Sequence, residues 1–77
     1  MPDPPPAWEL SRRQEIGARV REARLDADLT QIRLGEIVGL SHKTIHGIEY
    51  ATTNPTLGML IRIARAVGRP LSDLVGD

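Results

Sequence analysis

The chain contains no cysteine among its 77 residues, so neither a disulfide framework nor a thiolate metal site can stabilise it. Two histidines without a thiol also argue against a structural zinc site. The longest apolar runs extend over a few residues, whereas a membrane-spanning helix needs about 20. The N-terminus lacks the basic-then-apolar pattern of a signal peptide. These absences predict a soluble cytoplasmic protein without membrane partner, metal or cofactor.

A basic excess is also missing, because ten Lys and Arg side chains balance ten Asp and Glu side chains. Residues 12–24 carry five arginines against two glutamates, but residues 30–55 are neutral. Proteins that bind nucleic acid usually carry a basic excess. If this chain binds nucleic acid, phosphate attraction is therefore expected to be weak, and affinity must depend on shape fit, helix dipoles and dimerisation.

Proline is concentrated at the N-terminus, where residues 1–6 contain four. Prolines lack a backbone donor and favour an extended, solvated chain. We therefore expect a disordered tail over residues 1–10 and one domain over residues 11–77, which is too short for a second core. Trp8, the only tryptophan, either folds back onto that domain or mediates self-association.

Apolar residues recur at helical spacing, and no segment alternates as a strand would. Ser11 and Gln14 match a capping box and predict a helix over residues 11–26. The side chains expected on the inner face of this helix are Ile16, Val20, Ala23 and Ala27.

Two further helices are expected near the C-terminus. Thr56 caps the first, which Gly68 ends, and Pro70 opens a short second one. The apolar residues expected inside are Leu57, Leu60, Ile61, Ala64, Val67, Leu71, Leu74 and Val75. With the two helices described next, the chain is expected to be all-α with five helices.

The most informative segment is residues 30–49, TQIRLGEIVGLSHKTIHGIE. Thr30 and Ser41 are good N-caps for two short helices, and Gly39 stands where the chain leaves the first. The inward residues are expected to be Leu34, Ile37, Val38, Ile45 and Ile48. This pattern predicts a helix-turn-helix whose second helix can enter a DNA major groove.

The polar outer face of that second helix supplies the candidate DNA contacts. They are Ser41, His42, Lys43, Thr44, His46 and Gly47. Lysine donates to guanine O6 and N7, and histidine can donate to a base acceptor or to phosphate. Thr52 and Asn54, in the next loop, are expected to approach backbone phosphates. Because the two histidines share an exposed face without an enclosed pocket, no catalytic residue is expected.

From about residue 16 to residue 75 the chain resembles the phage repressor and Cro family, the xenobiotic-response-element (XRE) regulators of bacteria. The resemblance rests on Arg21 and Arg24, Thr30-Gln31, Gly39-Leu40-Ser41, Ile45, Ile48-Glu49, Asn54-Pro55-Thr56-Leu57 and residues 63–68. It implies a compact five-helix lambda-repressor-like domain. Such a domain usually dimerises, binds a palindromic operator on double-stranded DNA and regulates transcription in the bacterial cytoplasm, at the nucleoid when bound.

The resemblance also implies roles for single residues. Gln31 matches a glutamine whose amide reaches a phosphate at the N-terminus of its helix. His42 and Lys43 match the main base readers. Gly47 matches a third reader position, which here carries no side chain.

Arg24 and Glu49 match a pair that forms an ion pair between the first helix and the end of the third. Ala51 replaces the usual glycine after the third helix. Either that helix runs slightly longer, or Ala51 tolerates a strained conformation.

Three functional interpretations remain open. The first is a sequence-specific regulator that binds as a homodimer through the fifth helix, the loop before it or the Trp8 segment. The second is an antitoxin or controller-type regulator with an additional protein partner. The third is a protein-interaction module that kept the fold and lost DNA binding, which the neutral helix-turn-helix and the missing reader at Gly47 favour.

Overall fold

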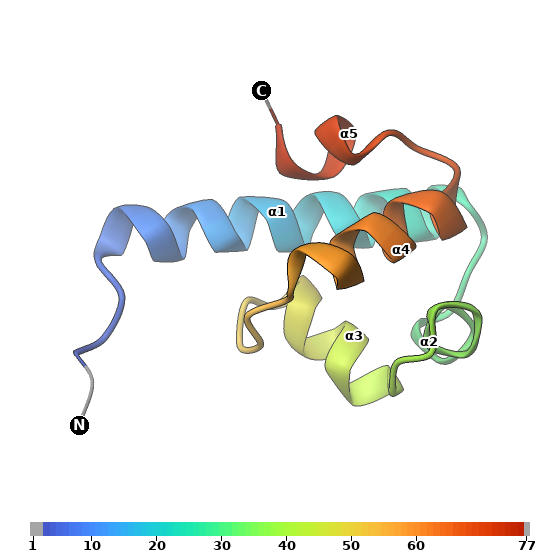
Figure 1. The fold of residues 1–77 in the computed structure, drawn as a ribbon, viewed down its shortest axis with the longest axis horizontal. Coiled ribbons are helices and arrows are strands. Elements are labelled where there is room, and N and C mark those ends of the chain that lie inside the picture. The colour runs from blue at the N-terminus through green and yellow to red at the C-terminus, as the bar shows by residue number, and fades with distance from the viewer. Residues whose placement is uncertain (1–2, 77) are drawn as a thin grey trace.

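A computed structural model of the chain describes residues 3–76, which form five helices and no strand. The helices are α1 (Ala7–Asp26), α2 (Gln31–Val38), α3 (His42–Glu49), α4 (Leu57–Val67) and α5 (Leu71–Val75). The long α1 contacts α3, α4 and α5, while α2 packs against α3 and α4 (Figure 1). This architecture confirms the expected all-α class. Residues 1, 2 and 77 of the predicted tail and domain lie outside the described residues.

The first helix begins earlier than the sequence predicted, at Ala7 instead of Ser11. Pro6 adopts an extended conformation, and its carbonyl accepts from the backbone N–H groups of Glu9 and Leu10 at 3.0 and 3.1 Å. The proline carbonyl thus starts the helix without a side-chain cap, and the expected capping box at Ser11 is not used. Residues 7–10, predicted as tail, form the first turn instead.

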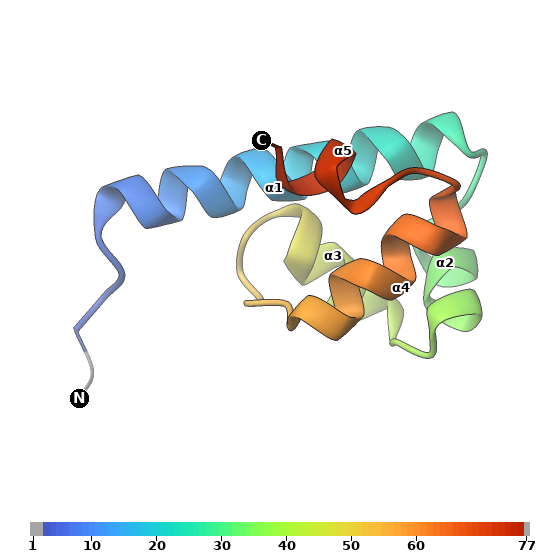
Figure 2. The ribbon, with the colours of Figure 1, turned by 45° about the horizontal axis from the view of Figure 1, so that its top comes forward.

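These first turns of α1 project beyond the other four helices (Figure 2). Trp8 lies on this projection with 73% of its surface exposed, so it does not fold back onto the domain. Of its two predicted roles, only self-association is compatible with this placement.

The core lies where all five helices meet, and every helix contributes to it. Its buried apolar members are Val20, Ala23, Leu34, Val38, Ile45, Ile48, Leu60, Ile63, Ala64, Val67 and Leu74. Leu71 and Val75 pack against it and are only partly buried. The apolar residues of α5 therefore pack against the core of their own chain.

Three residues expected inside are instead about half exposed or more: Ile37, Leu57 and Ile61. On α4 the buried stripe includes Ile63, which is fully buried. The predicted and observed stripes share Leu60, Ala64 and Val67, so helical spacing fits both of them. The packing of α4 against α1 and α2 selects the observed stripe over the predicted one.

The helix ends follow the local sequence signals. Thr30, Ser41 and Thr56 each accept a hydrogen bond from a backbone N–H three residues later, at 3.0–3.1 Å. Gly39 and Gly68 end α2 and α4 with φ angles of 76° and 72°, in the left-handed region that favours glycine. The caps predicted at Thr30, Ser41 and Thr56 and the stops predicted at Gly39 and Gly68 are thus confirmed.

The α1 and α3 helices cross closely at Gly17, which is buried. A Cβ atom at this position would lie 2.5 Å from the carbonyl oxygen of Ile48 and 2.6 Å from that of Glu49. We predict that Gly17→Ala destabilises the domain by about 1–3 kcal/mol, because the α3 backbone has to move away. Urea unfolding followed by circular dichroism measures the loss.

The matched control is Gly58→Ala on α4, where the nearest atom to an added Cβ is 3.9 Å away. This glycine is exposed within a helix, so alanine is expected to stabilise by about 0.5–1 kcal/mol. Equal stability changes for both variants would contradict a steric limit at the α1–α3 crossing.

Candidate functional site

The exposed face of α3 begins at its N-terminus, with His42 and Lys43 in the first turn. The Ser41 hydroxyl accepts from the Thr44 backbone N–H at 3.1 Å and lies 2.9 Å from the Thr44 hydroxyl. The Ser41 hydroxyl thus caps the helix, and the Thr44 hydroxyl is hydrogen-bonded to it. Thr44 is half-buried, while Ser41, His42 and Lys43 are exposed.

One turn further along α3, His46 is exposed and packs against Tyr50, whose ring centroid is 4.6 Å from that of the imidazole. Tyr50 is not among the candidate residues predicted from the sequence. The four-residue spacing between the two rings was the available signal, because side chains at this spacing meet on a helix.

The position of α3 is held by a buried ion pair between Arg24 of α1 and Glu49. Arg24 Nε and Nη2 donate to the two carboxylate oxygens at 2.7 and 3.1 Å, and the side chains are 8% and 0% exposed. Arg24 Nη1 also donates to the Leu29 carbonyl at 2.7 Å. The pair thus joins α1, the α1–α2 link and the end of α3.

Gln31 belongs to the same cluster. Its Nε2 donates to Glu49 Oε1 at 3.2 Å, and its side chain is half-buried between α2 and α3. The amide therefore lies against α3, whereas the resemblance implied a phosphate contact for it.

Gly47, at the position that matches a third reader, is buried and faces the loop after α3. Its carbonyl accepts from the backbone N–H groups of Thr52 and Thr53 at 2.8 and 3.1 Å. A Cβ atom here would overlap the Thr53 side chain. A side chain at this position would point into the loop and not toward a ligand of α3.

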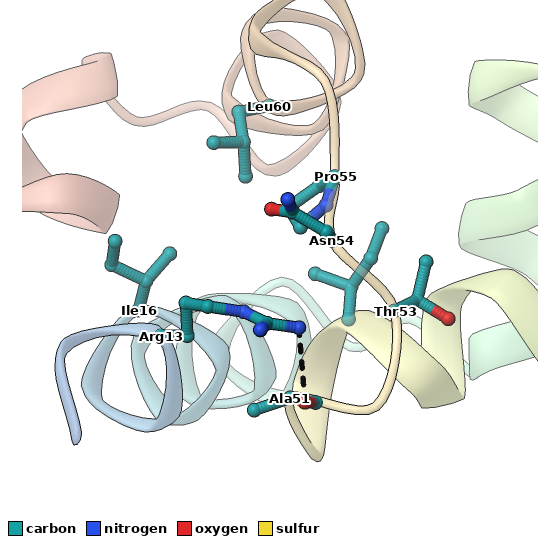
Figure 3. Close-up of a pocket in the computed structure, with 8 residues that line it drawn as sticks. Arg13, Ile16, Ala51, Thr53, Asn54, Pro55 and Leu60 are labelled. Atoms are coloured by element: carbon teal, nitrogen blue, oxygen red, sulfur yellow. Dashed lines mark hydrogen bonds between the residues drawn. The ribbon is translucent and has the colours of Figure 1, made fainter. Parts of the chain in front are cut away.

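The loop after α3 turns sharply at Ala51, which has a left-handed φ of 61°. Of the two possibilities for Ala51, the strained conformation is therefore the one adopted. The Ala51 carbonyl accepts from Arg13 Nη2 at 3.3 Å (Figure 3). Thr52 and Asn54, the predicted phosphate contacts, are both exposed on this loop.

A small pocket lies between this loop, α1 and α4 (Figure 3). It is lined by Arg13, Ile16, Ile48, Ala51, Thr53, Asn54, Pro55 and Leu60. Arg13 is the one ionisable side chain in this lining, so the pocket offers no pair of groups for acid–base catalysis.

Residues 3–76 contain no cluster of three or more His, Asp or Glu side chains arranged to hold a metal ion. None of the five helices is both long and apolar enough to cross a membrane.

We predict that Glu49→Ala lowers the free energy of unfolding by about 3–5 kcal/mol, because it leaves the Arg24 guanidinium buried without its carboxylate. The control is Glu36→Ala, which removes the exposed Arg33–Glu36 pair and should cost about 0–1 kcal/mol. Thermal melting of both variants measures the difference. An unchanged midpoint for Glu49→Ala would mean that the buried pair does not form.

Comparison with known proteins places this geometry among helix-turn-helix domains. A family described as "Helix-turn-helix" (HTH_3) matches residues 20–74. The immunity repressor protein of Bacillus phage phi105 is 36% identical over 62 residues, covering 80% of this chain and 43% of the repressor. An uncharacterized HTH-type transcriptional regulator of Methanothermobacter thermautotrophicus is 44% identical over 50 residues, covering 65% of this chain and 72% of the regulator. The chain thus spans less than half the length of the phage repressor.

Two solved structures share the fold. The restriction-modification controller protein C.AhdI from Aeromonas hydrophila superimposes with a TM-score of 0.78 at 27% identity, covering 87% of this chain and 97% of the controller. The clp gene regulator ClgR from Corynebacterium glutamicum superimposes with a TM-score of 0.80 at 23% identity, covering 96% of this chain and 72% of ClgR.

Proposed function

Because this chain belongs to the helix-turn-helix family, whose members are DNA-binding regulators and not enzymes, we propose that it is a cytoplasmic transcriptional regulator that binds a palindromic operator as a homodimer. In this proposal α3 enters the major groove. The carrying observation is that His42, Lys43 and His46 lie exposed on a helix whose other side is held by the buried Arg24–Glu49 pair.

Each candidate residue has a chemical role in this arrangement. Lys43 donates to guanine O6 and N7, and His42 donates to a base acceptor or to phosphate. Thr44 is half-buried, so its methyl group rather than its engaged hydroxyl is the part suited to a thymine methyl. Ser41, Thr52 and Asn54 are exposed around α3 and contact backbone phosphates.

A dimer is required because one helix reads only a few base pairs, too few to select a site within a genome. Two copies related by a two-fold axis place their α3 helices about 34 Å apart, in successive major grooves. The balanced charge of the chain makes this requirement stronger, since phosphate attraction alone is weak.

We infer that the second copy packs on α4. Leu57 and Ile61 lie one turn apart on this helix and are 63% and 50% exposed. An apolar stripe of this kind is suited to an isologous contact, in which the same surface meets itself. The predicted alternative at α5 has less support, since Leu74 is fully buried. Trp8 remains the competing surface.

A second candidate function is that of a controller-type regulator. It is favoured by the likeness to the restriction-modification controller protein, nearly the whole of which is covered by this chain. A controller-type regulator would bind DNA through the same α3 surface. It would differ from the first proposal in its protein partner or in the genes that it regulates. The protein-interaction alternative loses one of its two supporting observations. Position 47 faces the loop, so the absence of a side chain there is no argument against DNA binding.

In vitro selection from random-sequence duplexes at low salt tests DNA binding and operator symmetry together. We predict enrichment of a palindrome. Lys43→Ala should lower affinity for the selected site by about 1–3 kcal/mol, roughly 5- to 150-fold, because a base contact is lost.

Arg69→Ala is the control, since it also removes one positive charge but does so away from α3. The Arg69 side chain pairs with Asp26 at the end of α1 and lies in the link between α4 and α5. This variant should weaken binding far less than Lys43→Ala. Lys43 is the only lysine of the chain, so lysine-directed acetylation followed by mass spectrometry should show its protection by the selected duplex. Failure to enrich any sequence would favour the interaction-module alternative.

The dimer surface is tested by Ile61→Asp. We predict that this variant is monomeric in sedimentation equilibrium at concentrations where the wild type is dimeric, because two carboxylates would be buried at the contact. Its melting curve should still show a folded domain, since Ile61 is half exposed. Trp8→Ala is run in parallel, and loss of the dimer in that variant alone would assign the contact to the start of α1.

A further inference from the structure

The Gln31 side chain connects the buried ion pair to the exposed face of α3. Its Nε2 lies 3.2 Å from Glu49 Oε1 and 3.5 Å from Nδ1 of His46. A single amide nitrogen therefore faces two groups on α3, one buried and one exposed.

Glu49 decides how this amide is oriented. Its carboxylate is paired with Arg24 and can only accept hydrogen bonds. If the amide were reversed, the Gln31 oxygen would face a carboxylate oxygen, and the two would repel each other. The NH₂ group of Gln31 must therefore point to Glu49, and the carbonyl oxygen points away.

The orientation of the amide in turn decides which tautomer the neutral His46 ring adopts. An amide nitrogen carries two hydrogens, of which Glu49 takes one and the other is directed at His46 Nδ1. Nδ1 can accept this hydrogen only if it carries no proton, so the neutral ring holds its proton on Nε2. Tyr50 packs against the ring and restrains its plane.

We propose that Gln31 is a positioning residue for sequence recognition, which fixes His46 as the Nε2–H tautomer. His46 then presents a hydrogen-bond donor to DNA and no acceptor. In the major groove such a donor is satisfied by guanine O6 or N7, adenine N7 or thymine O4, and it conflicts with the amino group of cytosine. The base opposite His46 is therefore selected against cytosine, with guanine offering two acceptors.

This inference rests on the proposed entry of α3 into the major groove, but the tautomer does not. It also changes the role predicted for Gln31, because both amide hydrogens are directed within the protein and none is left for a phosphate.

The tautomer is measured in the free protein by long-range ¹H–¹⁵N correlation of the imidazole nitrogens at alkaline pH. His46 should show the Nε2–H pattern, while the exposed His42 serves as an internal reference for a freely averaging ring. In Gln31→Met, which keeps the length of the side chain but has no donor, the His46 pattern should move toward that of His42. A wild-type His46 with its proton on Nδ1, or a pattern that Gln31→Met leaves unchanged, would overturn the proposal.

Selection of bound DNA then tests the consequence for recognition. His46→Ala identifies the base position that His46 reads, as the one at which preference is lost. Gln31→Met should retain the rest of the palindrome and reduce discrimination against cytosine at that position by about 2- to 10-fold, the worth of one hydrogen bond. Circular dichroism melting confirms that both variants are folded.

The two proposals fail separately. If the wild type enriches no sequence, the proposed DNA binding fails while the tautomer measurement stands on its own. If the wild type enriches a palindrome and Gln31→Met gives the same preferences at every position, operator binding stands and the role of Gln31 is wrong. The role of Gln31 is equally wrong if His46→Ala changes no position.

Discussion

The buried Glu49 carboxylate is the constraint on which the arrangement of this domain depends. A charge without solvent contact has to be paired and hydrogen-bonded, and in the observed placement of α3 against α1 both Glu49 oxygens accept from Arg24. Arg24 also holds the Leu29 carbonyl, and Gln31 holds the same carboxylate from α2. Apolar packing brings the helices together, and this cluster helps to fix how α3 is oriented.

The same constraint links stability to recognition. The α3 backbone lies close against Gly17, and the Thr53 side chain lies close against Gly47. Little freedom is left for α3 to shift, so its outward residues are presented at fixed angles. A chain with balanced charges gains little from general attraction to DNA. In the proposed homodimer, affinity depends on direct fit and on two copies acting together, and a rigid α3 is the condition for both.

The sequence predicted the helices and their caps well, because these depend on neighbours three or four residues away. Thr30, Ser41 and Thr56 bind backbone N–H groups within their own turns. It was less successful where two local patterns fit equally. The α1 helix begins at the carbonyl of Pro6 instead of the Ser11 cap, and α4 turns Ile63 inward while Leu57 and Ile61 face out.

By itself the sequence determined the helix class, the helix-turn-helix and the polar residues that can lie on its outer face, since helical periodicity and capping are local. Only the tertiary structure decided that position 47 faces a loop, that Ala51 is left-handed, and that Gln31 lies between Glu49 and His46. Position 47 depends on how the next loop folds back onto α3. The Ala51 carbonyl is held by Arg13 and the Gln31 amide by α3, so these two contacts join segments far apart in the chain. A short-range pattern carries no information about which side of a helix such a distant segment will cover.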